Sequence, residues 1–190
     1  MNLLLLVGEI GSGKSTLANI LTKYGYYEET FASPIKQFAI NIGFDIDDIY
    51  GNQVQKNKVN DFWQISGRQF MQLFGTDLCR ELLPSKIPMQ LNGRNLWVRI
   101  MEKKISSYKE KNKLLVISDG RFKDEIKLVK EYNGKIIRII RPDNPYRLNE
   151  FNNKHLSEID IIEEPADYSI INNGIESMEE QILKIISSRC

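Results

Sequence analysis

The chain opens with an apolar run that leads directly into a glycine-rich stretch and then into a helical pattern. Leu3 to Val7 has the character of a short buried strand, and Gly8-Glu9-Ile10-Gly11-Ser12-Gly13-Lys14-Ser15 follows it without a break. Leu17, Ile20 and Leu21 then recur at helical spacing. A strand, a glycine-rich turn and a helix in this order predict a turn at the carboxyl end of a strand in an α/β fold.

The turn matches G-x-x-x-x-G-K-[ST], the pattern of a phosphate-binding loop (P-loop). Its glycines let the backbone curl around phosphate oxygens, and its N–H groups with the helix N-terminus supply positive partial charge. Lys14 is expected to reach the β- and γ-phosphates and Ser15 to offer its hydroxyl to Mg²⁺. A chance glycine-rich turn is the alternative, which the strand and helix on either side disfavour. The residues expected to bind ATP here are Gly11, Ser12, Gly13, Lys14, Ser15 and Thr16.

Composition places the chain among ordinary soluble globular proteins, because 42% of its 190 residues are apolar and 27% are charged. This length suits one domain with a sizeable core. Lys and Arg total 26 against 25 Asp and Glu, so no overall charge favours a nucleic-acid polymer or an anionic membrane. The apolar start is too short for a membrane span and lacks the charge of a signal peptide. Cys79 and Cys190 form neither a disulfide framework nor a metal pattern, and we expect a cytoplasmic location.

Strand-like runs alternate with helical patterns along the chain, which predicts an α/β fold with a mostly parallel five-stranded sheet. The expected strands are Leu3 to Val7, Leu114 to Ser118, Lys135 to Ile140 and Tyr168 to Ile171, with a weaker signal at Tyr26 to Glu29. Two stretches, Asp45 to Gln64 and Pro142 to Pro165, lose any pattern. They are expected to be irregular, as lids and binding segments often are.

Helices are marked by start and stop signals. Ser33 with Pro34 predicts the N-cap and first position of a helix that Gly43 ends. Ser66 with Gln69 fits a capping box. The other expected helices are a capping-box helix at Ser177 and Glu180, and the segments Leu96 to Tyr108 and Lys123 to Tyr132.

An acidic and a basic residue follow the strand Leu114 to Ser118. Asp119 stands where P-loop proteins place the carboxylate that holds Mg²⁺, and it could also bind the sugar of an acceptor. Alternatively, Asp119 caps the helix that begins near Lys123. Arg121 lies at the carboxyl end of the strand, where open α/β sheets bind ligands, and a guanidinium suits a phosphate monoester. An ordinary exposed loop arginine is the alternative for Arg121.

The helix after Ser66 has an apolar face of Phe70, Leu73, Phe74 and Leu78. Beside it runs a polar stripe of Gln69, Gln72, Thr76 and Arg80. Two amides, a hydroxyl and one charge differ from the Lys and Glu mixture of a solvated face, which favours ligand contact over simple solvation.

Arg141 and Arg147 are candidates for a lid that closes over the transferring phosphoryl group, with two surface arginines as the alternative. Trp97 lies in an amphipathic pattern that is more typical of a core residue than of a base-stacking one. His155 stands in a polar context that is typical of a solvated side chain.

Taken in order, these segments resemble the deoxynucleoside monophosphate kinases of large DNA viruses and phages. The resemblance rests on the P-loop, Phe31-Ala32-Ser33-Pro34-Ile35-Lys36, Gly67 to Asp77, Arg80, Trp97 and Asp119-Gly120-Arg121-Phe122. It implies a P-loop nucleoside-monophosphate-kinase-like three-layer fold in a single domain. Within that domain it implies a helical acceptor-binding insert at about 31–95 and a lid at about 141–160.

The resemblance also implies roles for individual residues. Lys14, Asp119, Arg141 and Arg147 would take part in transfer, Ser15 and Asp119 would hold Mg²⁺, and the adenine of ATP would rest near Asn173 and Gly174. Acceptor contacts are implied for Lys36, Arg68, Gln72, Arg80, Trp97, Asp119 and Arg121. A homodimer is compatible with this resemblance.

The expected activity is ATP-dependent phosphorylation of deoxynucleoside monophosphates to diphosphates. Another small-acceptor kinase of the same fold, such as a dephospho-coenzyme A or thymidylate kinase, is the first alternative. A nucleotide switch without an acceptor is less favoured. Asn57-Lys58-Val59-Asn60 lacks the final Asp of a guanine-binding motif and follows no strand.

Overall fold

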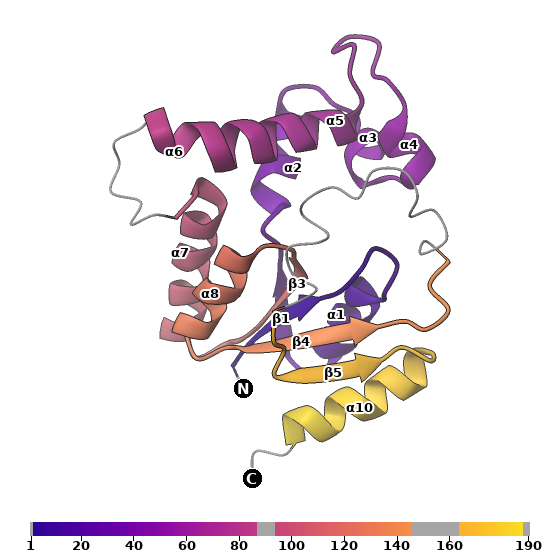
Figure 1. Cartoon of the computed structure of the whole chain (residues 1–190), viewed down its shortest axis with the longest axis vertical. Coiled ribbons are helices and arrows are strands. Elements are labelled where there is room, and N and C mark those ends of the chain that lie inside the picture. The colour runs from indigo at the N-terminus through magenta and orange to yellow at the C-terminus, as the bar shows by residue number, and fades with distance from the viewer. Residues whose placement is uncertain (1, 87–93, 146–163, 188–190) are drawn as a thin grey trace. The chain divides into compact units, whose positions relative to one another are not determined.

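The structure is a computed structural model that describes residues 2–86, 94–145 and 164–187. The chain divides into two compact units. The sheet unit comprises Met1–Thr30 and Glu102–Cys190, and the helical unit comprises Phe31–Met101 (Figure 1).

The sheet unit is built on five strands. They are β1 (Leu3–Val7), β2 (Tyr26–Glu29), β3 (Leu114–Gly120), β4 (Lys135–Ile140) and β5 (Tyr168–Ile171). Their order is β2-β3-β1-β4-β5, and each neighbouring pair is parallel. The prediction of an α/β fold with a parallel five-stranded sheet is therefore confirmed, including the weakly signalled strand at Tyr26.

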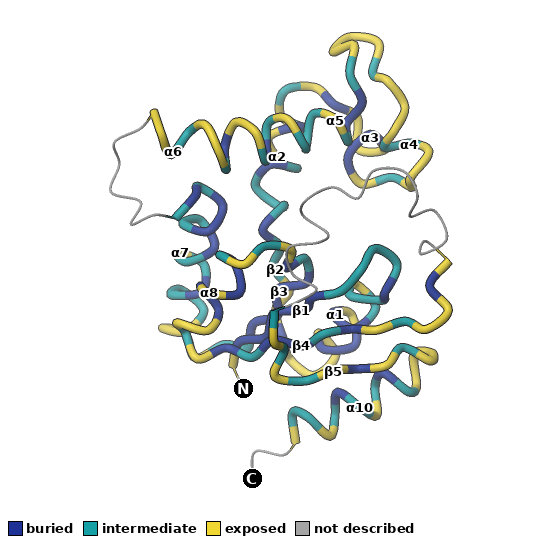
Figure 2. Tube along the Cα trace, viewed as in Figure 1, coloured by how far each residue is buried: buried dark blue, intermediate teal, exposed yellow. Residues whose placement is uncertain are grey.

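One face of this sheet is covered by α1 (Lys14–Lys23) and α10 (Ile175–Ser187). Leu4 and Leu6 of β1 pack there with Leu17 of α1 and Ile182 of α10, and all four side chains are almost fully buried. Full burial of such a side chain contributes about 1.5 to 3 kcal/mol. The central strands β1, β3 and β4 and the inner side of α1 form the buried centre of the unit (Figure 2).

The opposite face of the sheet is covered by α8 (Lys123–Glu131) and the second half of α7 (Leu96–Glu110), the helix that runs from the helical unit into the sheet unit. Neighbouring residues of a strand point to opposite faces. Tyr26 accordingly joins the α1 side, whereas the Tyr27 ring lies 5.6 Å from the Tyr108 ring of α7. The sheet unit thus has the three layers expected of its fold class.

The helical unit is formed by short helices around a small apolar core. Its elements are α2 (Ser33–Asn41), α3 (Ile46–Tyr50), α4 (Gln53–Asn57), α5 (Gly67–Gln72), a π-helix η1 (Leu73–Leu82) and α6 (Leu83–Lys86), followed by the start of α7. Ala39, Phe44 and Ile49 are buried together in this core. The rings of Phe38 and Phe70 both stack on Phe74, at centroid distances of 4.7 and 5.4 Å.

Several local expectations were wrong. The stretch Asp45 to Gln64 is not irregular throughout, because it holds α3 and α4, and the buried carboxylate of Asp48 accepts a hydrogen bond from Asn60 Nδ2 at 2.9 Å. The N-cap of α2 is Ala32 rather than Ser33. Ser177 lies inside α10, which begins at Ile175, so it does not cap that helix. The Ser66–Gln69 capping box is confirmed.

The π-helix is the largest departure from the predicted periodicity. Wider turns rotate successive side chains differently from an α-helix, and such turns are rare. Leu73 and Leu78 were expected on the apolar face but are 52% and 38% exposed, whereas Gly75 and Cys79 are buried. A Cβ on Gly75 would lie 2.8 Å from Ile35 Cδ1, so this helix approaches α2 closely at its glycine.

No helix in the described part of the chain has both the length and the apolar character to cross a bilayer.

Candidate functional site

The P-loop leaves β1 through three glycines that adopt backbone angles disfavoured for other residues. Gly8, Gly11 and Gly13 have φ values of +150°, +77° and +107°. The Ser12 N–H donates to Glu9 O at 3.1 Å, which closes the turn before α1 begins at Lys14. The motif therefore forms the tight strand-to-helix turn that its sequence predicted, with its last residues in the first turn of a ten-residue helix.

Lys14 lies across the start of this loop. Its Nζ donates to Gly8 O at 2.7 Å and to Glu9 O at 2.8 Å. Ser15 is exposed and Thr16 is half-buried in the same first turn. Ser12 is buried, and its Oγ has no hydrogen-bond partner within the described residues. The cation and the hydroxyl required for triphosphate binding are thus both at the N-terminus of α1.

Three side chains from other strand ends hold carbonyl groups of the P-loop. Asn144, which follows β4, donates to Ile10 O at 2.8 Å. Arg141 donates through Nη1 to Gly11 O at 3.3 Å. Asn172, directly after β5, donates to Ser12 O at 2.8 Å. Of these residues only Arg141 was a sequence candidate; the position of Asn172 at a strand end was the signal that could have identified it.

Asp119 lies at an irregularity in the pairing of β3 with β1, the strand that leads into the P-loop. Leu5 pairs with Ile117, but Val7 pairs with Gly120, so β3 carries one extra residue between these pairs. Such a bulge redirects side chains at the end of a strand. The N-cap of α8 is Phe122, so capping by Asp119, the alternative considered above, is not observed.

The position of these two loops is typical of a ligand site in a parallel sheet. The helix α1 leads from β1 to one edge of the sheet, while α8 leads from the adjacent strand β3 across to β4, on the opposite face. Open α/β sheets bind ligands at the carboxyl ends of the strands where the chain direction diverges in this way. In this sheet the chain diverges in this way between β1, which leads into the P-loop, and β3, which ends at Gly120.

The loop after β3 is held by a buried carboxylate. Glu125 is 1% exposed, and its Oε2 accepts the backbone N–H groups of Arg121 at 2.7 Å and Phe122 at 3.1 Å. The side chain of Arg121 is exposed. Glu125 was not among the sequence candidates, although a Glu at the third position of a helix is a known capping signal.

The remaining acceptor candidates lie in the helical unit. Lys36 Nζ lies 5.0 Å from the centre of the Tyr50 ring, and Arg68 Nη1 donates to Gln53 Oε1 at 2.7 Å. Gln72, Thr76 and Arg80 are partly exposed. In contrast, Gln69 uses its side chain in the capping box, so it is not available to the expected polar stripe.

Trp97 is a buried side chain with a hydrogen bond inside the helical unit. It is 8% exposed, and its indole Nε1 donates to Gly75 O at 2.7 Å. Asn173 and Gly174, the candidates for the adenine side, are exposed in the turn between β5 and α10. Arg147, His155 and most of the expected lid lie outside the described residues.

The candidate metal ligands fit Mg²⁺ rather than a metal that is held by protein side chains alone. No group of three or more His, Cys, Asp or Glu side chains suitable for a metal occurs within the described residues. Mg²⁺ usually keeps several water ligands and binds one or two carboxylates together with substrate phosphates. One hydroxyl at Ser15 and one carboxylate at Asp119 match that donor set.

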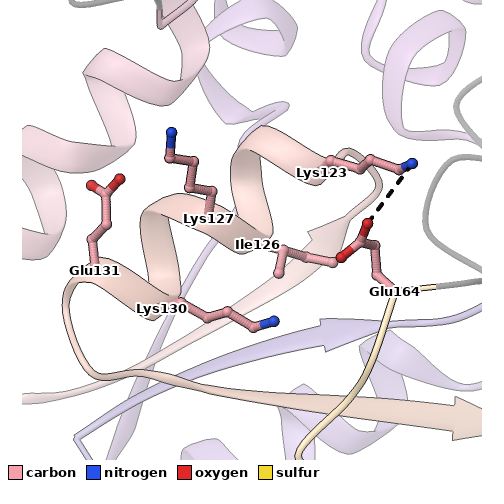
Figure 3. Close-up of a pocket in the computed structure, with 6 residues that line it drawn as sticks. All are labelled: Lys123, Ile126, Lys127, Lys130, Glu131 and Glu164. Atoms are coloured by element: carbon pink, nitrogen blue, oxygen red, sulfur yellow. Dashed lines mark ion pairs between the residues drawn. The ribbon is translucent and has the colours of Figure 1, made fainter.

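A separate hollow of about 400 Å³ lies on the outer side of α8 (Figure 3). It is lined by Lys123, Ile126, Lys127, Lys130, Glu131 and Glu164. Lys123 Nζ and Glu164 Oε1 are 3.8 Å apart across it. None of the candidate site residues lines this hollow, and its exposed lysines are typical of a solvated helix face.

Comparisons of the structure identify kinases of similar fold. A dephospho-CoA kinase from Campylobacter jejuni superposes with a TM-score of 0.55 at 17% sequence identity, covering 98% of this chain and 96% of that chain. A sugar kinase from a Janibacter species superposes with a TM-score of 0.51 at 12% identity, covering 98% and 95%. At these identities the likeness establishes the P-loop kinase fold and not the substrate.

Comparisons of the sequence are more specific. A protein of Acanthamoeba polyphaga mimivirus assigned as a deoxynucleotide monophosphate kinase is 32% identical over 198 aligned positions, which cover 99% of this chain and 97% of that protein. The family model for deoxynucleotide monophosphate kinase matches residues 42–182. That match begins after the P-loop, so the motif and the family model are independent observations. The chain belongs to the deoxynucleotide monophosphate kinase family.

Proposed function

We propose that this protein transfers the γ-phosphate of ATP to the 5′-phosphate of a deoxynucleoside monophosphate and so forms the diphosphate. The observation that carries the proposal is a P-loop of the required geometry in a member of this kinase family. The acceptor phosphate is already ionised, so no general base is required. Transfer is direct and in line, without a covalent enzyme intermediate.

The donor half of the reaction belongs to the sheet unit. Lys14 neutralises the β- and γ-phosphates, and Arg141 with Arg147 neutralises charge on the transferring phosphoryl group. Ser15 and Asp119 would hold Mg²⁺, which bridges phosphate oxygens and screens their charge when bound. Asn173 and Gly174 would lie beside the adenine. Gly11, Ser12, Gly13 and Thr16 complete the ATP contacts.

The proposed acceptor ligands are cations and hydrogen-bonding groups. Arg121 and Asp119 would contribute from the loop after β3, and the helical unit would supply Lys36, Arg68, Gln72, Arg80 and Trp97. Guanidinium groups suit the acceptor phosphate because they bind its oxygens in pairs. We accordingly assign residues 31–95 as the acceptor-binding insert and residues 141–160 as the lid of a single kinase domain.

We further propose a cytoplasmic homodimer that binds nucleotides and neither nucleic-acid polymers nor membranes. The near balance of 26 basic and 25 acidic residues supports the absence of polymer binding. Size-exclusion chromatography with light scattering tests the dimer, and a monomeric mass at micromolar concentration would refute it.

The proposed reaction is tested by a coupled kinase assay with each deoxy- and ribonucleoside monophosphate and with dephospho-coenzyme A. We expect diphosphate formation from at least one deoxynucleoside monophosphate and none from dephospho-coenzyme A. Turnover with dephospho-coenzyme A alone, or ATP hydrolysis that no acceptor accelerates, would refute the proposal. The Lys14→Ala variant should lose most activity and serves to exclude a contaminating kinase.

A further inference from the structure

We infer that Asn144 and Asn172 are positioning residues of the donor site, which fix two peptide groups of the P-loop so that the loop is already shaped for a triphosphate. This inference rests on the proposed use of ATP and adds residues that neither the loop motif nor the candidate list contained.

Asn172 joins three segments of the sheet unit. Its Nδ2 donates to Ser12 O at 2.8 Å, and its Oδ1 accepts the N–H of Gly174 at 3.2 Å. Its backbone N–H donates to Ile140 O at 2.7 Å. The P-loop, the end of β4 and the turn before α10 are therefore tied to one side chain.

The P-loop sequence accommodates this side chain through a glycine. A Cβ on Gly13 would lie 2.5 Å from Asn172 Nδ2, closer than real Cβ contacts. A residue with a side chain at this position would have to displace the asparagine. The glycine before Lys14 thus has a second role besides its backbone angle, because it leaves room for the amide.

Asn144 holds the preceding part of the loop from a buried position. It is 6% exposed, and its Nδ2 donates to Ile10 O at 2.8 Å and lies 3.4 Å from Glu9 Oε2. Rotating the amide away would remove the donor from the Ile10 carbonyl. Because an unsatisfied polar group in a buried setting is costly, the orientation of this amide is fixed.

The two bonds determine where the loop N–H groups point. In a trans peptide the C=O and N–H groups point in opposite directions. With the carbonyls of Ile10 and Ser12 turned toward the asparagines, the N–H groups of Gly11 and Gly13 are turned away from them. Fixing such donors before ATP arrives lowers the ordering cost of binding.

The test replaces each amide by a carboxylate of the same shape. In Asn172→Asp the introduced carboxylate can still accept the Gly174 N–H, but it faces Ser12 O without a proton to donate. Asn144→Asp removes the donor to Ile10 O and also places a second carboxylate beside Glu9 Oε2. Asn19→Asp, on the exposed side of α1, is the matched control because it adds equal charge without touching the loop. The readout is the Kd of ATP·Mg²⁺ by calorimetry without any acceptor.

At about pH 8 we expect Kd to rise about tenfold in Asn172→Asp and Asn144→Asp, as for loss of a hydrogen bond to a buried acceptor, and to stay unchanged in Asn19→Asp. Lowering the pH to about 5 increases the protonated fraction of the introduced carboxyl, which can then donate to the carbonyl that faces it. The ratio of variant to wild-type Kd should then fall. Protonation of ATP does not affect this ratio, because it changes both Kd values equally.

Wild-type affinity in Asn172→Asp at about pH 8 would overturn the inference, as would a weakened affinity whose ratio does not change with pH. Asn172 is half-buried, so its variant gives the answer even if the buried Asn144→Asp substitution prevents folding. Because no acceptor is present, failure of the proposed acceptor chemistry would leave this measurement intact.

Discussion

Single backbone positions determine whether the P-loop can form, and Gly13 is constrained twice. Its φ of +107° disfavours any side chain, and a Cβ would also collide with Asn172. Gly25 has a φ of +86°, but a Cβ there meets no atom of the described residues within 4 Å. A substitution at Gly25 therefore introduces backbone strain alone, whereas a substitution at Gly13 introduces both strain and a steric clash.

We expect Gly13→Ala to lower the free energy of unfolding by roughly 3 kcal/mol and Gly25→Ala by about 1 to 2 kcal/mol, since only the first adds a clash to the strain. Urea denaturation measures both. ATP affinity should fall only in Gly13→Ala. Equal destabilisation by the two variants would show that the Asn172 contact imposes no cost.

At the scale of elements, β1 and the first half of β3 were predictable because each is a continuous apolar run, whereas the Tyr-Tyr-Glu-Glu sequence of β2 gave only a weak signal. A parallel sheet covered on both faces buries both sides of its central strands, as in β1, whose five residues are all buried. The bounds of β4 and β5 also match the prediction. The P-loop was predictable for a related reason, since its turn geometry depends on its own glycines. The hydrogen bonds from Asn144 and Asn172 to the P-loop were not predictable, because their partners are far away in the sequence.

The π-helix shows why helical periodicity fails where tertiary contacts decide. Gly75 lies against Ile35, and its carbonyl accepts the indole N–H of Trp97, twenty-two positions along the chain. No local signal encodes either contact. The same hydrogen bond satisfies the indole N–H of the buried Trp97, and this structural role is separate from the acceptor role proposed for it.

Removing that indole donor should destabilise the helical unit. In Trp97→Phe the Gly75 carbonyl loses the indole donor in a buried setting, which costs about 2 kcal/mol in free energy of unfolding. Guanidinium denaturation monitored by circular dichroism measures the loss. Trp63→Phe is the matched control, because Trp63 is 37% exposed and should cost less than half as much. Equal losses would contradict the assigned role of the hydrogen bond.

The edge strand β5 is preceded by an acid that ties it to β4. Asp167 accepts hydrogen bonds from Ile136 N–H at 2.9 Å and from Lys135 Nζ at 2.8 Å. Burial alone raises the pKa of Asp167, but these two hydrogen bonds and the nearby lysine charges bring the pKa below its ordinary value. The charged form is therefore favoured by folding, and its contribution is fully present above the ordinary carboxyl pKa.

Asp167→Asn should lower the free energy of unfolding by about 1 kcal/mol at neutral pH. The difference from wild type should shrink as pH falls below about 4, because the wild-type carboxylate becomes protonated. Denaturation across this pH range measures it. Asp143→Asn, which removes an equal charge at an exposed turn, is the control. A difference that stays constant with pH would argue against the charged contacts.

At the scale of the whole molecule, most of the proposed acceptor ligands belong to a different compact unit from the proposed donor site. The donor groups at the P-loop belong to the sheet unit, whereas Arg68 and Arg80 belong to the helical unit. Arg121 is the one proposed cationic acceptor ligand on the sheet unit within the described residues. This division makes the assignments separable by kinetics, because each substrate has its own KM.

We expect Arg80→Ala to raise the acceptor KM at least tenfold, as for loss of a charge-assisted hydrogen bond, with the KM for ATP nearly unchanged. Arg121→Ala should do the same although it lies on the other unit. Asn172→Asp should show the reverse pattern and raise the KM for ATP alone. Lys109→Ala is the control. Lys109 lies in α7 beside the Tyr132 ring, and its replacement should change neither the acceptor KM nor the KM for ATP. A normal acceptor KM in Arg80→Ala would remove Arg80 from the site. A raised KM for ATP in Arg121→Ala would reassign Arg121 from the acceptor to the donor.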